Sequence, residues 1–488
     1  MDRSLNDTAD FPAYQHDDSS DDIVVPAAEQ YALVIAWSAT QPERVGEVAV
    51  FPEAGKTLIV GRGDLAPETR AWFVRQRPGE TGSPSPLDGP SLSRRQISVR
   101  ALSFGLEIQV IGDTRTFVNG HGPRPRSTTA VLVPGDTVRF GRELLLQCIK
   151  RRTMLPCRFF RAEDLRAFGE PDAAGFVGES PAAWALREAI AGQGQAWEPI
   201  MVLGAPGTGK ALVAAATHRL SDRADQPLVR HRGGCLPLER FPFAFFGHVA
   251  NYPHTGTADE PGLVGAAGSG TLLVEEIAGL PRGAQLMLNR ILDPGREYRR
   301  CGEDTCRSSD GRVIATTSRD ESAFEPSFYS RFMNRIYVPS LFERREDIPL
   351  LVRHFLLERA EHNPDTAGRF VQTDENGRRD PRVDPRVIDH VIRSPLAGNV
   401  RELQRLVVEA IMWTEPGEVI TRPPHWGSAL VPEGAEGAEF PTAEQIERTL
   451  LQESGSVTRA AAQLGLRDQR ELERVMRRIG MHEREVTT

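Results

Sequence analysis

Short apolar runs separated by polar turns dominate the first part of the chain. After residue 30, stretches rich in β-branched and aromatic residues alternate with Gly, Pro and Asp, a pattern typical of strands joined by turns. We expect strands at residues 32–37, 57–60, 96–101, 106–111, 130–133 and 144–149. Several short strands with no helical period between them predict an all-β sandwich over residues 29–151.

The pattern changes after residue 175. Apolar strands at 200–203, 272–274 and 313–316 alternate there with segments of helical period at 211–219 and 283–292. This alternation predicts an α/β domain with a parallel sheet over residues 176–345. Residues 346–415 have a helical period throughout, with helices expected at 348–362, 385–394 and 400–413.

The segments outside these domains differ in character, so we predict a multidomain protein. Residues 1–28 are rich in Asp and Ser and lack any period, which predicts a disordered acidic tail. Residues 152–175 and 416–440 are expected to be linkers, the second because it is rich in Pro, Gly and Glu. In residues 441–488, compact helices on either side of a turn at Gly465 predict a small all-α helix-turn-helix.

Length and charge narrow the classes of protein. The chain has 488 residues, which is enough for three domains of about 100–200 residues each. Its net charge of −8 excludes a general binder of polyanions, so any contact with nucleic acid must come from a local patch. No apolar run reaches the roughly 18 residues needed to span a bilayer, and the acidic N-terminus is unlike a secretory signal. We therefore expect a cytoplasmic protein with no membrane contact, whose five scattered cysteines are reduced thiols.

A phosphate-binding motif follows the apolar strand at 200–203. The sequence GAPGTGK at 204–210 fits GxxxxGK and precedes a helical segment, as this motif requires. The backbone N–H groups of such a loop surround phosphate oxygens, and the lysine reaches the outer phosphates. Only three lysines occur in the chain, at positions 56, 150 and 210. The residues expected to bind the nucleotide in this loop are Gly204, Ala205, Pro206, Gly207, Thr208, Gly209, Lys210 and Ala211.

Two acidic residues end the apolar strand at 272–274. Glu275 is expected to hold Mg²⁺ through water, and Glu276 is expected to polarise the water that attacks ATP. The alternative is a strand end with two solvated acids. Ala211 stands where a magnesium-binding hydroxyl usually follows the lysine, so Thr208 is the candidate substitute.

Residues 176–413 resemble the AAA+ domain of sigma-54-dependent activators, the bacterial enhancer-binding proteins. Besides the phosphate loop and the acidic pair, the matching motifs are VGES at 177–180, HRLS at 218–221, FGH at 246–248, RVIATT at 312–317, ERREDIP at 343–349 and GNVREL at 398–403. The resemblance implies a ring-forming ATPase with a helical lid that remodels sigma-54 RNA polymerase. It also implies that Arg401 senses the nucleotide phosphates from the lid and that Arg331 is a trans-acting arginine finger.

Several positions depart from the family pattern. The family loop that contacts sigma-54 reads GAFTGA, and its counterpart here contains His254, Thr255 and Gly256. The first arginine finger position holds Glu325, the asparagine that restrains the catalytic glutamate aligns with Arg232, and the sensor asparagine is Ser318. These changes favour an alternative in which the protein binds nucleotide and DNA but does not remodel polymerase.

The β-rich segment resembles a forkhead-associated (FHA) domain, although Gln96 replaces the structural histidine of that family. The motifs are Gly61-Arg62, Ser93-Arg94 and Asn119-Gly120. The resemblance implies a phosphothreonine site on loops at one end of the sandwich. Arg62 and Ser93 would bind the phosphate, Arg94 would add charge, and Asn119 would hold the peptide backbone. The alternative is a sandwich whose polar loops bind nothing.

The C-terminal helices resemble the Fis-type module of enhancer-binding proteins. The arginines expected to contact DNA are Arg467, Arg470, Arg474, Arg477 and Arg478. The alternative is a helical dimerisation module. The whole sequence thus predicts an ATP- and Mg²⁺-dependent transcription regulator that forms a dimer or a ring and responds to a phosphorylated partner. A phospho-dependent scaffold in a kinase pathway is a further alternative.

Overall fold

The computed structural model describes residues 29–426, except 53–54, 64–68, 79, 83, 153–154, 156–157, 160–165, 235 and 416–418, together with Thr449 and Gln463. The predicted acidic tail and nearly all of the predicted helix-turn-helix lie outside these residues. The chain falls into two compact units. Residues 185–340 belong to the first unit, and residues 29–157, 163–184 and 341 onward belong to the second.

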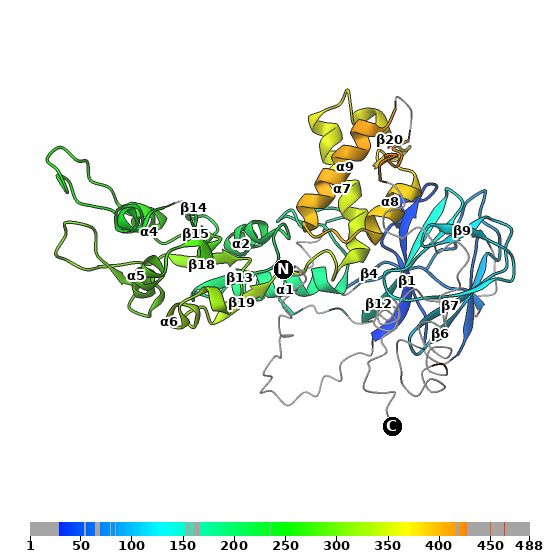
Figure 1. Ribbon diagram of the computed structural model, residues 1–488, viewed down its shortest axis with the longest axis horizontal. Coiled ribbons are helices and arrows are strands. Elements are labelled where there is room, and N and C mark those ends of the chain that lie inside the picture. Colours follow the sequence, from blue (N-terminus) through cyan, green and yellow to red (C-terminus); the bar gives the residue numbers. More distant parts are fainter. Residues whose placement is uncertain are drawn as a thin grey trace. The chain divides into compact units, whose positions relative to one another are not determined.

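A five-stranded parallel sheet forms the centre of the first unit (Figure 1). Its strands, in spatial order, are β14 (Leu228–Arg232), β15 (Thr271–Glu275), β18 (Arg312–Thr317), β13 (Ile200–Leu203) and β19 (Asn334–Tyr337). Every residue of β13 and β18 is buried, as expected for a parallel sheet covered on both faces. The predicted α/β fold with a parallel sheet is confirmed.

Helices and a hairpin surround this sheet. They are α1 (Pro181–Gly194), α2 (Lys210–Arg219), α3 (Phe241–Phe246), α4 (Gly262–Ala267), α5 (Arg282–Leu292), α6 (Pro326–Tyr329) and the hairpin β16–β17 (Glu297–Tyr298, Arg307–Ser308). Both helices predicted from the sequence, at 211–219 and 283–292, occur with their first residue one position earlier. Strands β14 and β19 and helices α1, α3, α4 and α6 were not predicted.

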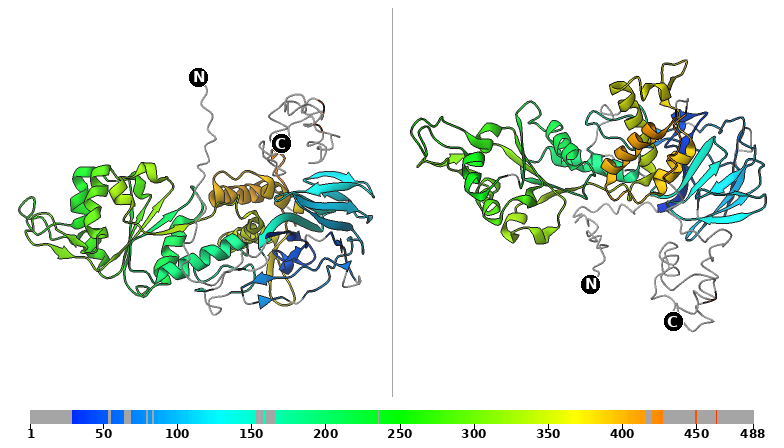
Figure 2. Two further views of the ribbon diagram at one scale, coloured as in Figure 1. Left: turned by 90° about the horizontal axis from the view of Figure 1, so that it is seen from below. Right: turned by 45° about the horizontal axis from the view of Figure 1, so that its top comes forward.

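Two antiparallel sheets form the β-rich domain, which we define as residues 29–152. One sheet has six strands in the order β2-β1-β12-β11-β8-β9, and the other has four in the order β10-β7-β6-β3. The strands of this domain are drawn in blue and cyan in Figure 2. Buried apolar residues from both sheets form one core. The strands are β1 (Glu29–Ser38), β2 (Val48–Val50), β3 (Thr57–Val60), β6 (Ile97–Leu102), β7 (Gly105–Val110), β8 (Thr116–Val118), β9 (His121–Arg124), β10 (Thr129–Leu132), β11 (Thr137–Phe140) and β12 (Leu144–Arg152), with a small hairpin β4–β5 (Gln76–Arg77, Glu80–Thr81).

Three helices and a hairpin form the lid, which follows the parallel-sheet unit in sequence. They are α7 (Ile348–His362), α8 (Pro385–Arg393), α9 (Asn399–Trp413) and the hairpin β20–β21 (Val371–Thr373, Arg379–Pro381). Asp384 caps α8 by accepting a hydrogen bond from the backbone N–H of Arg386, and Pro385 occupies the first turn. All three predicted helices occur, each within one residue of its expected bounds.

The lid and the β-rich domain share a hydrophobic core. Ala36, Trp37, Val45 and Leu145 of the β-rich domain belong to the same buried cluster as the apolar residues of α7, α8 and α9. The second unit therefore contains both the lid and the β-rich domain, and it begins again at Leu341 rather than at residue 346. Within the part of the chain that the structure describes, no helix is long and apolar enough to cross a bilayer.

Candidate functional site

The glycine-rich loop at 204–209 joins a central strand to a helix. Strand β13 pairs in parallel with β18 on one side and with β19 on the other, and it ends at Leu203. Helix α2 begins at Lys210, directly after the loop. The N-terminal end of α2 therefore contributes its positive dipole to the site, as expected for phosphate binding.

Glycine is required at several positions of this loop. Gly207 and Gly209 have φ angles of 79° and 102°, which side chains rarely adopt. A Cβ atom at Gly204 would lie 2.8 Å from the carbonyl oxygen of Val338, so this residue must also be glycine. The loop can therefore curl tightly at the end of β13 and present backbone N–H groups.

The side chain of Lys210 lies within the loop and is 6% exposed. Its Nζ donates to the carbonyl oxygens of Gly204 at 3.0 Å and Ala205 at 3.3 Å. The same Nζ lies 3.2 Å from Oε1 of Glu276. The charge of the lysine is thus held between the phosphate loop and the acidic end of β15.

Glu276 follows β15 in a left-handed conformation, with φ of 48°. Its Oε2 accepts hydrogen bonds from the hydroxyl of Ser318 at 2.8 Å and from the backbone N–H of Ser318 at 3.1 Å. Burial opposes ionisation of this carboxyl, but the hydrogen bonds from Ser318 and the nearby charge of Lys210 hold its pKa below the usual value. Glu276 is therefore an ionised group with two partners, Ser318 directly after β18 and Lys210 at the start of α2.

Glu275 and Thr208, the residues proposed for Mg²⁺, differ in their surroundings. Glu275 is the last residue of β15 and is half-buried. The hydroxyl of Thr208 donates to the carbonyl oxygen of Ala205 at 2.9 Å and is turned into the loop. Among the described residues, no group of three or more His, Cys, Asp or Glu side chains could hold a metal ion by itself. A divalent ion at this site would need oxygen ligands from a bound nucleotide as well.

The predicted arginine finger is bound within its own chain. Arg331 pairs with Asp293 through an Nε–Oδ1 distance of 2.6 Å, and its guanidinium also donates to the carbonyl oxygen of Ser327. Glu325, at the other finger position, pairs with Arg282 at 3.3 Å. Arg331 would have to leave Asp293 to reach a nucleotide elsewhere.

Arg401 lies in the second unit, in the first turn of α9, and is exposed. It lines a cavity of about 750 Å³ between α7 and α9, together with Phe355, Arg405 and Met412. The cavity wall carries charges of both signs. The guanidinium of Arg401 is exposed to solvent on this wall.

The loop that corresponds to the sigma-54 contact lies between α3 and α4. Its ends are joined by backbone hydrogen bonds between His248 and Glu260 in both directions, and Asn251 donates to the carbonyl oxygen of Thr257. The predicted contact residues His254, Thr255 and Gly256 are all exposed at its tip. These three consecutive residues are therefore accessible to a partner.

Loops of the β-rich domain bring Arg62 and Ser93 together. The backbone N–H of Arg62 donates to the carbonyl oxygen of Ser93 at 3.1 Å. A Cβ atom at Gly61 would lie 2.1 Å from the carbonyl oxygen of Arg94, so only glycine allows this approach. Within the described part of the chain, the buried Nε of Arg62 has no hydrogen-bond partner, and Arg94 is exposed.

Thr114 joins this group, although the sequence did not suggest it. Its Oγ1 lies 3.2 Å from Oγ of Ser93 and donates to the carbonyl oxygen of Ser91. The Oγ of Ser93 also accepts a hydrogen bond from the backbone N–H of Asp113. Thr114 carries no motif of its own, and only the three-dimensional arrangement reveals it.

Asn119 is not brought to this group. It follows β8, whereas Thr114 precedes that strand. The side-chain amide of Asn119 donates to Asp136 at 3.0 Å and accepts from the backbone N–H of Thr137 at 2.9 Å. The expectation that Asn119 shares one end of the domain with Ser93 therefore does not agree with the structure, because these local bonds place Asn119 in the turn at the far end of β8. The predicted DNA-binding arginines at positions 467 to 478 lie outside the described residues.

Comparisons with known proteins agree with this geometry. The family described as the sigma-54 interaction domain matches residues 176–341, and the AAA+ ATPase lid domain matches residues 342–424. The transcriptional regulatory protein ZraR of Escherichia coli is 33% identical over 306 residues, covering 60% of this chain and 66% of ZraR. The response regulator protein PilR of Pseudomonas aeruginosa is 31% identical over 312 residues, covering 59% of this chain and 66% of PilR.

Two further proteins are similar to part of the chain. The DNA-binding transcriptional regulator NtrC of Azospirillum brasilense is 34% identical over 238 residues, covering 47% of this chain and 46% of NtrC. A crystal structure of NtrX from Brucella abortus in complex with ATP aligns with a TM-score of 0.43 and 26% identity, covering 63% of this chain and 69% of NtrX. The chain thus spans just under two thirds of the length of ZraR and PilR and less than half of NtrC. Residues 176–424 belong to the family of sigma-54 interaction AAA+ domains with their ATPase lid, homologous to those of the ZraR, PilR and NtrC regulators.

Proposed function

We propose that this chain is a DNA-binding transcription regulator of the sigma-54-interacting type that binds ATP with Mg²⁺. A phosphothreonine-containing partner controls it through the β-rich domain, and residues 441–488 bind DNA. The observation that carries the proposal is the loop at 204–209, with Lys210 held at its centre beside Glu276. The relatives ZraR and NtrC, which are named as transcriptional regulators, support the biological role.

The phosphate loop accounts for nucleotide binding. Backbone N–H groups of the loop surround the phosphates, and Lys210 exchanges the carbonyl oxygens of Gly204 and Ala205 for phosphate oxygens. Glu275 would hold Mg²⁺, which would supply positive charge to neutralise the phosphates. Arg401 adds a positive charge from the lid.

Hydrolysis depends on Glu276. An ionised carboxylate can accept a proton from water and orient it towards a phosphoryl group. The low pKa of Glu276 keeps it ionised at neutral pH. Its pairing with Lys210 must first be released, which happens when phosphate takes over the lysine. Arg331 would act on the nucleotide of a neighbouring copy in a dimer or ring.

The β-rich domain offers a site for phosphate. Among the described residues, the buried Nε of Arg62 has no hydrogen-bond partner. The backbone N–H of Arg62 donates to the carbonyl oxygen of Ser93, whose hydroxyl lies 3.2 Å from that of Thr114. Guanidinium and hydroxyl donors suit a phosphothreonine, which carries nearly two negative charges and three acceptor oxygens. Arg94 lies next in the chain and is exposed, so it adds charge at the rim.

One assay series tests the central proposal. We would measure ATP binding, ATP turnover and open-complex formation by sigma-54 RNA polymerase with the purified full-length protein. The proposal expects ATP binding, turnover that depends on Arg331, and open complexes that depend on His254, Thr255 and Gly256. Absence of ATP binding would overturn it.

A second candidate is a regulator that binds nucleotide without hydrolysing it. Three observations favour it: Glu276 is held by both Lys210 and Ser318, Arg331 is paired with Asp293, and Glu325 carries a negative charge where a finger would be positive. Binding of ATP without turnover and without open complexes would establish this candidate. Turnover that is lost in Arg331→Ala would exclude it.

A further inference from the structure

Two short segments of the second unit lie close in sequence to the points at which the chain passes between the two units. The chain enters the first unit between Trp184 and Ala185, inside α1, and leaves it between Ser340 and Leu341. We call residues 176–180 the entry connector and the turn Arg345–Asp347 the exit connector. Both connectors belong to the second unit, which also contains the β-rich domain.

Asp347 ties the two connectors together. Its Oδ1 accepts hydrogen bonds from the backbone N–H groups of Glu179 at 2.7 Å and Ser180 at 2.9 Å, and its Oδ2 accepts from the hydroxyl of Ser180 at 2.6 Å. A Cβ atom at Gly178, which has φ of 145°, would lie 2.6 Å from Oδ2 of Asp347. The carboxylate of Asp347 therefore holds the exit connector directly against the entry connector.

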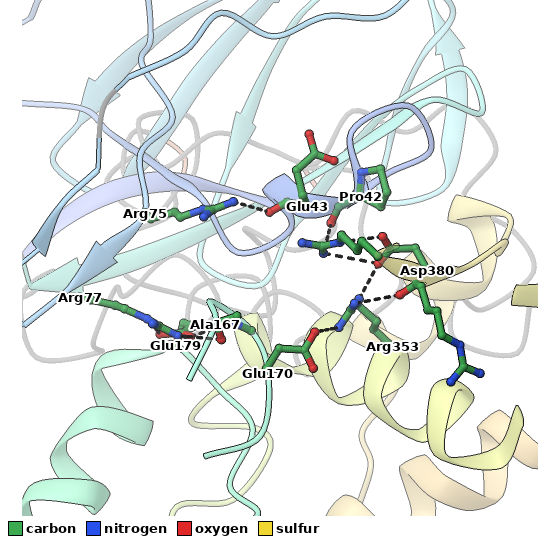
Figure 3. A network of polar contacts seen from close by, with 12 residues as sticks. Pro42, Glu43, Arg75, Arg77, Ala167, Glu170, Glu179, Arg353 and Asp380 are labelled. Carbon is green, nitrogen blue, oxygen red and sulfur yellow. Dashed lines mark hydrogen bonds and ion pairs between the residues drawn. The ribbon is translucent and has the colours of Figure 1, made fainter. Parts of the chain in front are cut away.

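Arg77 of the β-rich domain holds the entry connector. Its guanidinium makes two hydrogen bonds to the carboxylate of Glu179, at 2.5 Å and 3.0 Å, and donates to the carbonyl oxygens of Arg166 and Ala167. The side chains of Arg77 and Glu179 are 7% and 5% exposed, so the ion pair is almost completely buried from solvent. Figure 3 shows Arg77 pointing from the β-rich domain towards Glu179 and Ala167.

Arg151, in β12, holds both connectors at once. Its Nη2 donates to the carbonyl oxygen of Glu179 at 2.8 Å, and its Nη1 donates to Oε2 of Glu346 at 2.5 Å. The side chain of Arg151 is 2% exposed. A third arginine, Arg353 of α7, pairs with Glu170 and Asp380 on the lid side (Figure 3).

Buried pairs of this kind fix geometry more than they add stability. The cost of removing two charges from water offsets most of their attraction, but loss of one partner leaves the other charge buried and unpaired. Bidentate guanidinium–carboxylate contacts also define direction as well as distance. Arg77 and Arg151 thus link the position of the β-rich domain to the backbone path of both connectors.

We propose that the β-rich domain braces the two connectors through Arg77 and Arg151 and thereby sets nucleotide affinity in the first unit. The inference rests on the proposed ATP binding, and it assigns to the β-rich domain a structural link to that site. A partner that binds the β-rich domain and shifts Arg77 or Arg151 changes the path of the chain into and out of the nucleotide-binding unit.

The test compares Arg151→Met and Arg77→Met with Arg100→Met in the full chain. Arg100 is a matched control, because it pairs with Glu107 at 2.7 Å wholly within the β-rich domain. Hydrogen exchange would be followed in peptides covering both connectors, and affinity for a fluorescent ATP analogue would be measured. We expect hydrogen exchange to be at least tenfold faster in both connectors of Arg151→Met and in the entry connector of Arg77→Met. In both variants, the affinity for the ATP analogue should change at least threefold. Arg100→Met should match the wild type.

Wild-type exchange in the connectors of a folded Arg151→Met variant would overturn the brace, as would unchanged affinity. If the arginine variants unfold, Glu346→Gln and Glu179→Gln replace them, since these changes keep side-chain shape while removing the charge. Faster connector exchange in the glutamine variants supports the brace, and wild-type exchange in both overturns it. If the wild-type protein binds no ATP, the proposed function fails, whereas the exchange data still decide whether the connectors are braced.

Discussion

The Nζ of Lys210 lies 3.2 Å from Oε1 of Glu276, so the phosphate loop and the carboxylate after β15 are directly paired. The lysine also donates to two carbonyl oxygens of its own loop. A phosphate group entering the loop would compete with three acceptors for one ammonium group. The proposed nucleotide binding would therefore release Glu276 from Lys210.

Replacement of Lys210 by alanine should abolish nucleotide binding. The substitution removes the only side-chain cation within the loop at 204–210, and charge-assisted hydrogen bonds to phosphate are the strong ones. We expect the Kd for ATP to rise at least 100-fold by isothermal titration calorimetry. Lys150→Ala is the matched control, because Lys150 lies in the β-rich domain and pairs with Glu29. Equal affinities of Lys210→Ala and the wild type would contradict a phosphate role for this loop.

Ser318→Ala should move the acid limb of ATP turnover to higher pH. Glu276 has a lowered pKa, so in the wild type it remains ionised as pH falls and loses its charge only below the ordinary value of 4.5. Without the hydroxyl of Ser318, one of the groups that lower this pKa is gone, and protonation begins at higher pH. Turnover measured from pH 4 to pH 7 checks the shift, with Glu276→Gln as the variant that lacks the base. Superimposable profiles of Ser318→Ala and the wild type would rule out this coupling.

The sequence was most informative where a pattern is local. Helix α7 has the bounds expected from its apolar period, and the phosphate loop is a contiguous motif between a strand and a helix. Strand β14 was missed because Arg230, His231 and Arg232 break any apolar run. Strand β19 was missed because Asn334 and Arg335 leave only two of its four residues to form an apolar run.

Contacts between distant residues could not be predicted in the same way. Ser318 and Glu276 are 42 positions apart, and Arg331 and Asp293 are 38 positions apart, so only the folded chain brings each pair together. Thr114 lies beside Ser93 because of the fold, and nothing in the sequence marks Thr114 as a site residue. The common core of the lid and the β-rich domain likewise depends on which face of each element is apolar in three dimensions.

Arg312→Met should strongly destabilise the nucleotide-binding unit. Arg312 is 1% exposed, and it donates to the carbonyl oxygens of Gly194, Ala196 and Thr217 near the ends of α1 and α2. Burial lowers its pKa to about 10, so it still carries its charge at pH 7. Loss of three buried hydrogen bonds costs about 2–5 kcal/mol. Thermal unfolding should show a lower midpoint, while exposed Arg290→Met should leave it unchanged; equal midpoints for the two variants would contradict the role of Arg312.

Arg62→Met and Asn119→Ala should separate phosphate binding from folding. Arg62 has a buried Nε with no partner among the described residues, and its backbone N–H contacts Ser93, whereas the amide of Asn119 is occupied by Asp136 and Thr137. In fluorescence anisotropy with a library of phosphothreonine peptides, Arg62→Met should weaken binding at least tenfold. Asn119→Ala should change the affinity less than twofold but lower the unfolding midpoint. A large loss of affinity in a stably folded Asn119→Ala protein would show that the phosphopeptide site extends to this turn.

His390 should make the lid less stable in acid. Its ring stacks on Trp426, with centroids 5.0 Å apart and planes at 15°. Burial, followed by the charges of Arg422 and Arg393, lowers the pKa of His390 to about 4. The unfolded chain, with a histidine pKa of about 6.5, then binds a proton that the folded lid does not accept.

The stability that neutral His390 provides is therefore complete above pH 6.5 and is lost progressively as pH falls towards about 4. His390→Phe keeps the stacked ring but cannot be protonated, so its unfolding midpoint should exceed that of the wild type by an amount that grows on acidification. His362→Phe, at the exposed end of α7, serves as the control and should follow the wild type. Because other buried histidines also titrate, the decisive quantity is the difference between His390→Phe and the wild type at pH 7.5, 6 and 5. A difference that stays constant over this range would mean that His390 is not protonated on unfolding in the expected window.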